Sequence, residues 1–200
     1  MSAPRIKGSA FQAVIHDLQR LQQSGGLAEG ELEPHDLELL RAGIQSGSWY
    51  PIAAYRRMLA LLVAKECGPD REAYLRRRGR AAAERILKMG LYSHLDAAMR
   101  AAERAPDRWV EQVGRVMTTL SPAMFSFSRW EFVAGDGARL FSLNVHEAGE
   151  IPEETRILLQ GFIEALFVPF TEERVQVTSR RPSPDLIVYE GARLTGSRAG

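Results

Sequence analysis

Residues 124–190 constrain the fold most, because their pattern predicts two strand pairs separated by a helix. The first pair covers residues 125–133 and 139–146, joined by the glycine-rich residues 134–137, a combination typical of a β-hairpin. The second strand alternates apolar and polar side chains, as a strand with one buried face does. Its apolar members are Phe141, Leu143 and Val145.

The same stretch continues with a helix and a second strand pair. Proline and two carboxylates at residues 151–154 favour a helix start, since the proline needs no donor there and the acids suit the positive helix end. Apolar residues occupy more than one side of this helix as far as Phe167, so we expect it to be covered on two sides. Strands at 175–178 and 186–189 follow, around a turn at 182–185.

The first strand changes phase along its length. Phe125 and Phe127 share one side, whereas Trp130 and Phe132 share the other. An extra residue in one strand produces such a change, so the sequence predicts a bulge near Ser128.

Before this stretch, the pattern predicts helices only, over residues 9–120. The predicted helices begin near Ser9, Pro34, Pro51, Arg71, Tyr92 and Asp107, and the fourth of them spans residues 71–89. The expected fold class is therefore α+β: a helical part followed by a ββαββ unit whose antiparallel sheet packs on helices. We expect a single domain of residues 1–200, with a loosely held tail at 191–200.

Composition and charge exclude several classes of partner and compartment. The 26 basic and 25 acidic residues leave a net charge of +1, so no strong field favours nucleic acid or an anionic membrane. No apolar run reaches the ~20 residues of a membrane span, and no signal peptide is visible. The single cysteine, Cys67, excludes an intrachain disulfide and suits a reducing compartment, so we expect a cytoplasmic protein.

The densest charge run of the chain lies in the predicted helix 71–89. It contains Arg76, Arg77, Arg78 and Arg80. Leu75 and Gly79 fall on the opposite side, which favours a solvated face, with an anionic ligand or an acidic partner as the alternative. Gly79 within the apolar stripe predicts a close approach of two helices.

The chain resembles the superfamily of haem nitric-oxide-binding domains, 4-vinyl-reductase-type domains and TRAPP-type trafficking subunits, which share a helical part followed by ββαββ. Within it, the chain is most similar to uncharacterised vinyl-reductase-like proteins of myxobacteria. The resemblance covers residues 7–192 and lies in four motifs: Lys7-Gly8-Ser9, Ser48-Trp49-Tyr50-Pro51, Gly79-Arg80-Ala81-Ala82-Ala83-Glu84 and Gly161-Phe162-Ile163-Glu164. These are mostly core and turn residues, so they imply fold more than function.

The sequence offers no catalytic or metal-binding constellation. His16, His35, His94 and His146 are nowhere three or four residues apart, the spacing that places two ligands on one helix face. The cysteines common around the last strand pair of vinyl-reductase-type domains are absent here. We therefore expect no metal, no cofactor and no enzymatic activity.

Aromatic residues near the helix-to-sheet junction are the candidate ligand site. The predicted pocket residues are Trp49, Tyr55, Trp109, Phe127 and Trp130, with Arg129 as a polar group that could orient a ligand. The alternative is that these rings simply fill the core.

Two functions from different classes remain open. The resemblance implies a non-enzymatic sensory or regulatory domain that binds a small apolar or amphipathic ligand between sheet and helices. The alternative is an interaction adaptor of the trafficking-subunit type, which dimerises and has no ligand. In either case we expect a homodimer in contact through N-terminal helices.

Haem is the most specific group that the resemblance could imply. In the haem-binding branch a helical histidine ligates the iron, and His94 lies in the corresponding part of this chain. That branch also holds the propionates with a Tyr-x-Ser-x-Arg motif, which is absent: residues 125–129 place Ser and Arg at the wrong spacing. We therefore expect no haem.

Overall fold

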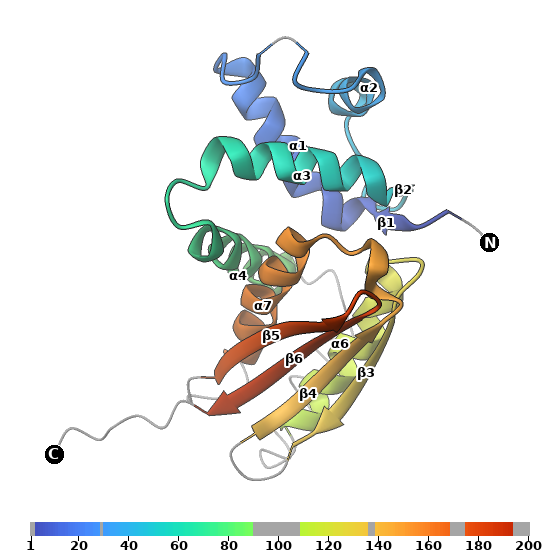
Figure 1. Cartoon of the computed structure of the whole chain (residues 1–200), viewed down its shortest axis with the longest axis vertical. Helices are drawn as coiled ribbons and strands as arrows, with labels where there is room; N and C mark the ends of the chain where they lie inside the picture. The colour runs from blue at the N-terminus through green and yellow to red at the C-terminus, as the bar shows by residue number, and fades with distance from the viewer. Residues whose placement is uncertain (1–2, 29, 90–108, 136–138, 169–174, 194–200) are drawn as a thin grey trace, which may run out of the picture.

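A computed structural model describes residues 3–28, 30–89, 109–135, 139–168 and 175–193. One group of helices forms a layer away from the sheet, whereas a second group packs with it (Figure 1). The first group is α1 (Gly8–Gln23), α2 (Pro34–Ala42) and α3 (Ile52–Glu66), and the second is α4 (Arg71–Met89), α6 (Trp109–Met124) and α7 (Glu153–Phe167). The bounds of α4 agree with the sequence prediction.

The sheet confirms the α+β class and the ββαββ order. Its strands are β3 (Arg129–Ala134), β4 (Arg139–His146), β5 (Val175–Ser183) and β6 (Leu186–Arg193). They lie in the order β3-β4-β6-β5, with every neighbouring pair antiparallel. A short 3-10 helix, η2 (Ala148–Glu150), precedes α7. The bounds of β4 are those predicted from its alternation.

The first strand of the unit is shorter than predicted, and the predicted bulge is wrong. Helix α6 continues through Pro122 to Met124, and β3 begins only at Arg129. The register of β3 with β4 is continuous, and the shifts in the sheet lie elsewhere, at Arg139/Phe141 and Arg180/Ser183. The change of phase at Phe127 arises because that residue precedes the strand.

The N-terminal part is not helical throughout. β1 (Arg5–Lys7) pairs antiparallel with β2 (Trp49–Pro51), which leads directly into α3. At the other end of the chain, β6 extends to Arg193, so residues 191–193 belong to a strand and not to a loose tail. The predicted helix at 92–104 and residues 194–200 lie outside the described residues.

Helices α4 and α7 cross closely at two glycines. A Cβ built on Gly79 would lie 1.9 Å from the carbonyl oxygen of Leu158, and one on Gly161 would lie 2.1 Å from that of Arg76. Both backbones therefore touch where a side chain would not fit. The packing role predicted for Gly79 is confirmed.

Candidate ligand site between the two halves

The start of the chain is tied to the start of the ββαββ unit. Ile6 of β1 forms an isolated bridge with Phe125, just beyond α6. The backbone N–H of Ser126 donates to the Arg5 carbonyl, and the Arg5 N–H donates to the Ser126 hydroxyl, each at 3.0 Å. These contacts hold the helical layer against the end of α6.

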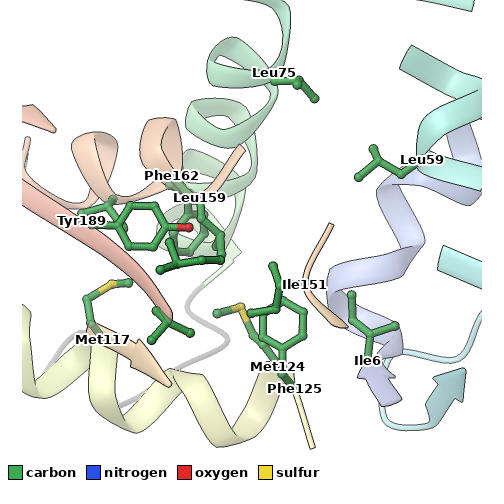
Figure 2. Close-up of a cluster of buried hydrophobic side chains, with 14 of the residues drawn as sticks. Ile6, Leu59, Leu75, Met117, Met124, Phe125, Ile151, Leu159, Phe162 and Tyr189 are labelled. Carbon is green, nitrogen blue, oxygen red and sulfur yellow. The ribbon is translucent and has the colours of Figure 1, made fainter. Parts of the chain in front are cut away.

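We call α1–α3 with β1 and β2 the helical half, and the sheet with α4, α6 and α7 the other half. Buried apolar side chains from both halves belong to one cluster (Figure 2). Leu59 of α3 and Leu75 of α4 are fully buried, and Ile151, which follows η2, is 2% exposed. The other members that Figure 2 labels are Ile6, Met117, Met124, Phe125, Leu159, Phe162 and Tyr189. A molecule bound between the halves would therefore meet a mostly hydrocarbon surface.

A small polar group interrupts this apolar interior. The Thr155 hydroxyl of α7 donates to the Tyr55 hydroxyl of α3 at 3.3 Å, and both residues are buried. Burial raises the pKa of Tyr55, and the positive charge of Arg78 offsets part of that rise. Tyr55 is therefore a neutral phenol at any ordinary pH, able to donate one hydrogen bond.

Arg78 is a half-buried residue that the sequence prediction placed on a solvated face. Its guanidinium lies 2.6 Å from the Asp17 carboxylate of α1 and donates to the Tyr74 hydroxyl at 3.3 Å. Its Nε is buried and has no hydrogen-bond partner among the described residues. The solvated-face prediction is wrong here, because the acidic partners come from helices distant in sequence: Asp17 of α1 and Glu66 of α3.

Arg76 and Arg80 face α7. Both donate to the carboxylate of Glu164, which is 8% exposed, and the contact with Arg80 measures 2.8 Å. They line an open hollow of about 560 Å³ over the first turns of α4, together with Asp70, Glu72, Ala73 and Arg77. Three arginines therefore stand against three carboxylates, those of Glu164, Asp70 and Glu72, so the charge of the hollow is balanced.

The residues predicted to line the pocket fall in separate places. Tyr55 is 3% exposed, and its ring meets that of Phe11 edge-on at 5.3 Å within the helical half. Trp49 is half-buried in β2, where the Lys7 ammonium lies 4.6 Å from its ring. Trp109 is the first residue of α6, and its side chain lies outside the described part of the structure.

The remaining three predicted residues lie where the sheet begins. Trp130 is 7% exposed, and its indole N–H donates to the Ser128 hydroxyl at 3.0 Å. Phe127 is half-buried against Phe125, and Arg129 is exposed. Among the interactions of the described residues, none joins Tyr55 to these three. The polar residues that meet where α3, α4 and α7 approach one another are instead Tyr55, Thr155 and Arg78, of which the predicted pocket included only Tyr55.

The described residues contain no metal-binding group and no membrane-crossing helix. Nowhere in the described ranges do three His, Cys, Asp or Glu side chains come together as a metal ion requires. Within the same ranges, no helix is both long and apolar enough to cross a lipid bilayer.

Comparison with solved structures identifies the fold. The chain superposes on a mutant of the T. tengcongensis H-NOX domain with a TM-score of 0.52 and 14% identity, over 96% of this chain and 100% of that one. A Cs H-NOX mutant carrying 4-cyano-L-phenylalanine gives 0.53 and 14%, over 96% and 98%. An oxygen-binding H-NOX domain related to soluble guanylate cyclases gives 0.55 and 15%, over 94% and 95%.

The described chain therefore has the fold of haem-NO-binding (H-NOX) domains, and this part of the predicted resemblance is confirmed at the level of fold. No protein-family model matches the chain, and no curated protein matches it in sequence. At such low identity the likeness carries no residue roles to this chain.

The described histidines do not suit the iron of a haem. His16 and His35 are exposed on α1 and α2. His146 is half-buried in β4, where its Nε2 lies 3.0 Å from the Glu131 carboxylate. His94, the candidate from the sequence, lies outside the described residues.

Residues 125–129, the stretch most similar to a propionate-binding motif, already use their hydroxyl groups within the protein. The Ser126 hydroxyl accepts the backbone N–H of Arg5, and the Ser128 hydroxyl accepts the indole N–H of Trp130. Arg129 is exposed on the sheet. The residues in the described part of the chain therefore do not fit a haem, despite the fold.

Proposed function

We propose that this chain is a sensory or regulatory domain that binds a small apolar or amphipathic molecule between its helical half and its sheet. The observation that carries the proposal is the interior seam between α3, α4 and α7. It is lined by apolar side chains but contains one phenol and one unpaired guanidinium N–H, from Tyr55 and Arg78. The ligand would be largely hydrocarbon, with one acceptor oxygen for these donors.

Two features support this class of function over haem-based sensing. The chain has the fold of an oxygen-binding H-NOX domain, whereas its described histidines are exposed or paired in the sheet and offer haem no axial ligand. We place the chain nearer to the vinyl-reductase-type branch of the superfamily for this reason. We also propose that it performs no catalysis, because the seam holds no nucleophile paired with a base among the residues described.

Native mass spectrometry of the full chain, purified without harsh washing, tests the proposal. The expected result is a complex whose mass exceeds that of the 22.3 kDa chain by the mass of one small molecule. Leu75→Trp provides the structural counterpart, because its indole would enter the space that the ligand uses. We expect this variant to fold, with a melting temperature close to that of the wild type, and to lose the bound mass.

Leu18→Trp is the matched control, because Leu18 is equally buried but lies on α1, outside the three helices of the proposed seam. Overpacking such a site costs about 1–3 kcal/mol. The proposal is wrong if Leu75→Trp is destabilised as much as Leu18→Trp and the wild-type chain carries no bound mass. The seam would then be filled by close-packed side chains.

A further inference from the structure

The two edges of the sheet differ in how they are closed. At β5, side chains of α7 take the place of a neighbouring strand: Glu164 accepts the Val177 N–H at 3.2 Å, and Gln160 donates to the Val177 carbonyl at 2.6 Å. One turn earlier, Arg156 donates to the Ser179 carbonyl at 2.9 Å. Three outward backbone groups in the middle of β5 are therefore already bonded to side chains of α7, which hinders the addition of another strand at this edge.

The outward groups of the opposite edge, β3, can be identified from its ladder. The N–H of Gly135 donates to the Leu140 carbonyl at 2.8 Å, in the same register that pairs β3 with β4. Hydrogen-bonded and non-hydrogen-bonded pairs alternate in an antiparallel ladder, so every second residue before Gly135 also bonds to β4. The residues between them point their N–H and C=O groups away from β4: Trp130, Phe132 and Ala134.

These outward groups have no partner in the described part of the chain. None of the hydrogen bonds among the described residues reaches the backbone N–H or C=O of Trp130, Phe132 or Ala134. The sequence of β3, RWEFVA, contains neither proline nor lysine, and its charged residues are Arg129 and Glu131, one of each sign. Val133 is a large apolar side chain of the same strand and is 42% exposed. β3 follows the margin of the sheet opposite β5 (Figure 1).

We propose that β3 pairs antiparallel with β3 of a second copy of this chain, so that the two sheets become continuous across a two-fold axis. Pairing of this kind lets outward N–H and C=O groups of the two copies bond to each other. An isologous contact also closes after two subunits, and therefore gives a dimer and not a fibre. The inference does not depend on the proposed ligand.

Charge selects the register of this pairing. Outward residues must face outward residues, so the two-fold axis passes through an outward residue or midway between two of them. The axes that place Glu131 opposite another residue of β3 pass through Trp130, through Phe132, or midway between these two. An axis through Trp130 places Arg129 opposite Glu131 of the second copy, and the reverse. The midway axis places Glu131 opposite its own copy, where like charges repel, and an axis through Phe132 places it opposite Val133. Complementary charge favours the axis through Trp130.

Sedimentation of the full chain across a concentration series tests the proposal. The wild type is expected to be a dimer. Arg129→Glu and Glu131→Arg should each raise the dissociation constant about tenfold or more, because two attractive pairs become repulsive. The double variant Arg129→Glu/Glu131→Arg should restore the wild-type value, since the pairs are then reversed but complementary.

Arg180→Glu on β5 is the matched control, because it reverses an exposed charge at the closed edge; its dissociation constant should not change. Circular dichroism of each variant checks that it retains its fold. A monomeric wild type overturns the proposal. So does an Arg129→Glu variant that dimerises as tightly as the wild type, which would point instead to a contact through the N-terminal helices.

Discussion

Gly79 of α4 and Leu158 of α7 lie so close that a Cβ on the glycine would stand 1.9 Å from the leucine carbonyl oxygen. Gly161, one turn along α7, has the same relation to the backbone of Arg76, at 2.1 Å. The two helices therefore meet backbone to backbone at reciprocal glycines. This crossing joins α4, which borders the proposed ligand seam, to α7, which closes the β5 edge.

Gly79→Ala should destabilise the protein by about 2 kcal/mol, because the added methyl group would push the two backbones apart. The loss should appear although alanine is by itself the better helix former, by ~1 kcal/mol. Gly47→Ala is the control, since nothing lies within 4 Å of a Cβ at Gly47. Urea denaturation measures both. Equal stability of the two variants would contradict the close crossing.

Glu164→Gln should lower the free energy of unfolding by about 2–3 kcal/mol, because it leaves Arg76 and Arg80 without the buried carboxylate that they share. Glu150→Gln is the control. Glu150 is paired with Arg56 at 2.8 Å, but both side chains are about half exposed, so its loss should cost under ~1 kcal/mol. Denaturant titration compares the two, and a similar small loss for both would contradict the role of Glu164.

Stability should fall at alkaline pH, in part through Tyr74. Burial raises the pKa of Tyr74 from 10.0 to about 12, assisted by its hydrogen bond to Glu66 and opposed by Arg78. The folded state thus holds the phenolic proton more tightly than the unfolded state. Its stabilising contribution is complete below pH 10 and is lost as the pH rises through about 12.

The variant Tyr74→Phe isolates this contribution. Its unfolding free energy should decline less steeply than that of the wild type between pH 10 and 12, the interval that the shifted pKa defines. Denaturation curves across this interval provide the measurement. Parallel pH profiles for the two proteins would show that Tyr74 titrates normally.

Trp130→Ala should destabilise the fold by ~3–5 kcal/mol, because its indole is 7% exposed and packs beneath the sheet. Phe127→Ala should cost about half as much, since Phe127 precedes β3 and is only half-buried. Thermal melts of both variants test this order. A negligible shift for Trp130→Ala would contradict the burial of that side chain.

Protein purified from cells supplied with a haem precursor should be colourless, and added hemin should give no saturable Soret shift. The reason is that the described histidines are exposed or paired on the sheet, and the Ser126 and Ser128 hydroxyls are occupied. A one-to-one Soret band that disappears in His94→Ala would contradict this and place the chain among the haem-based sensors.

Local pattern alone predicted the elements that carry a strong period or a clear boundary. Strand β4 agrees to the residue because its alternation ends at turns on both sides, and α4 agrees because Asp70 and Gly90 bound its apolar stripe. The same logic gave the ββαββ order, and it identified Gly79 as a packing residue. These features depend on neighbours within a few residues, which the sequence displays directly.

Tertiary structure decided the features that join distant parts of the chain. β1 and β2 are three residues each, too short for an alternating pattern, and they form only because the fold places residues 5–7 beside 49–51. Arg78 follows the helical period of a surface residue, yet it is half-buried and paired with Asp17 of α1. Likewise, the sequence does not distinguish a closed edge from an open one. That difference arises because side chains of α7 bond to the outer edge of β5, whereas no described side chain bonds to the outward backbone groups of β3, which is a matter of where whole elements pack.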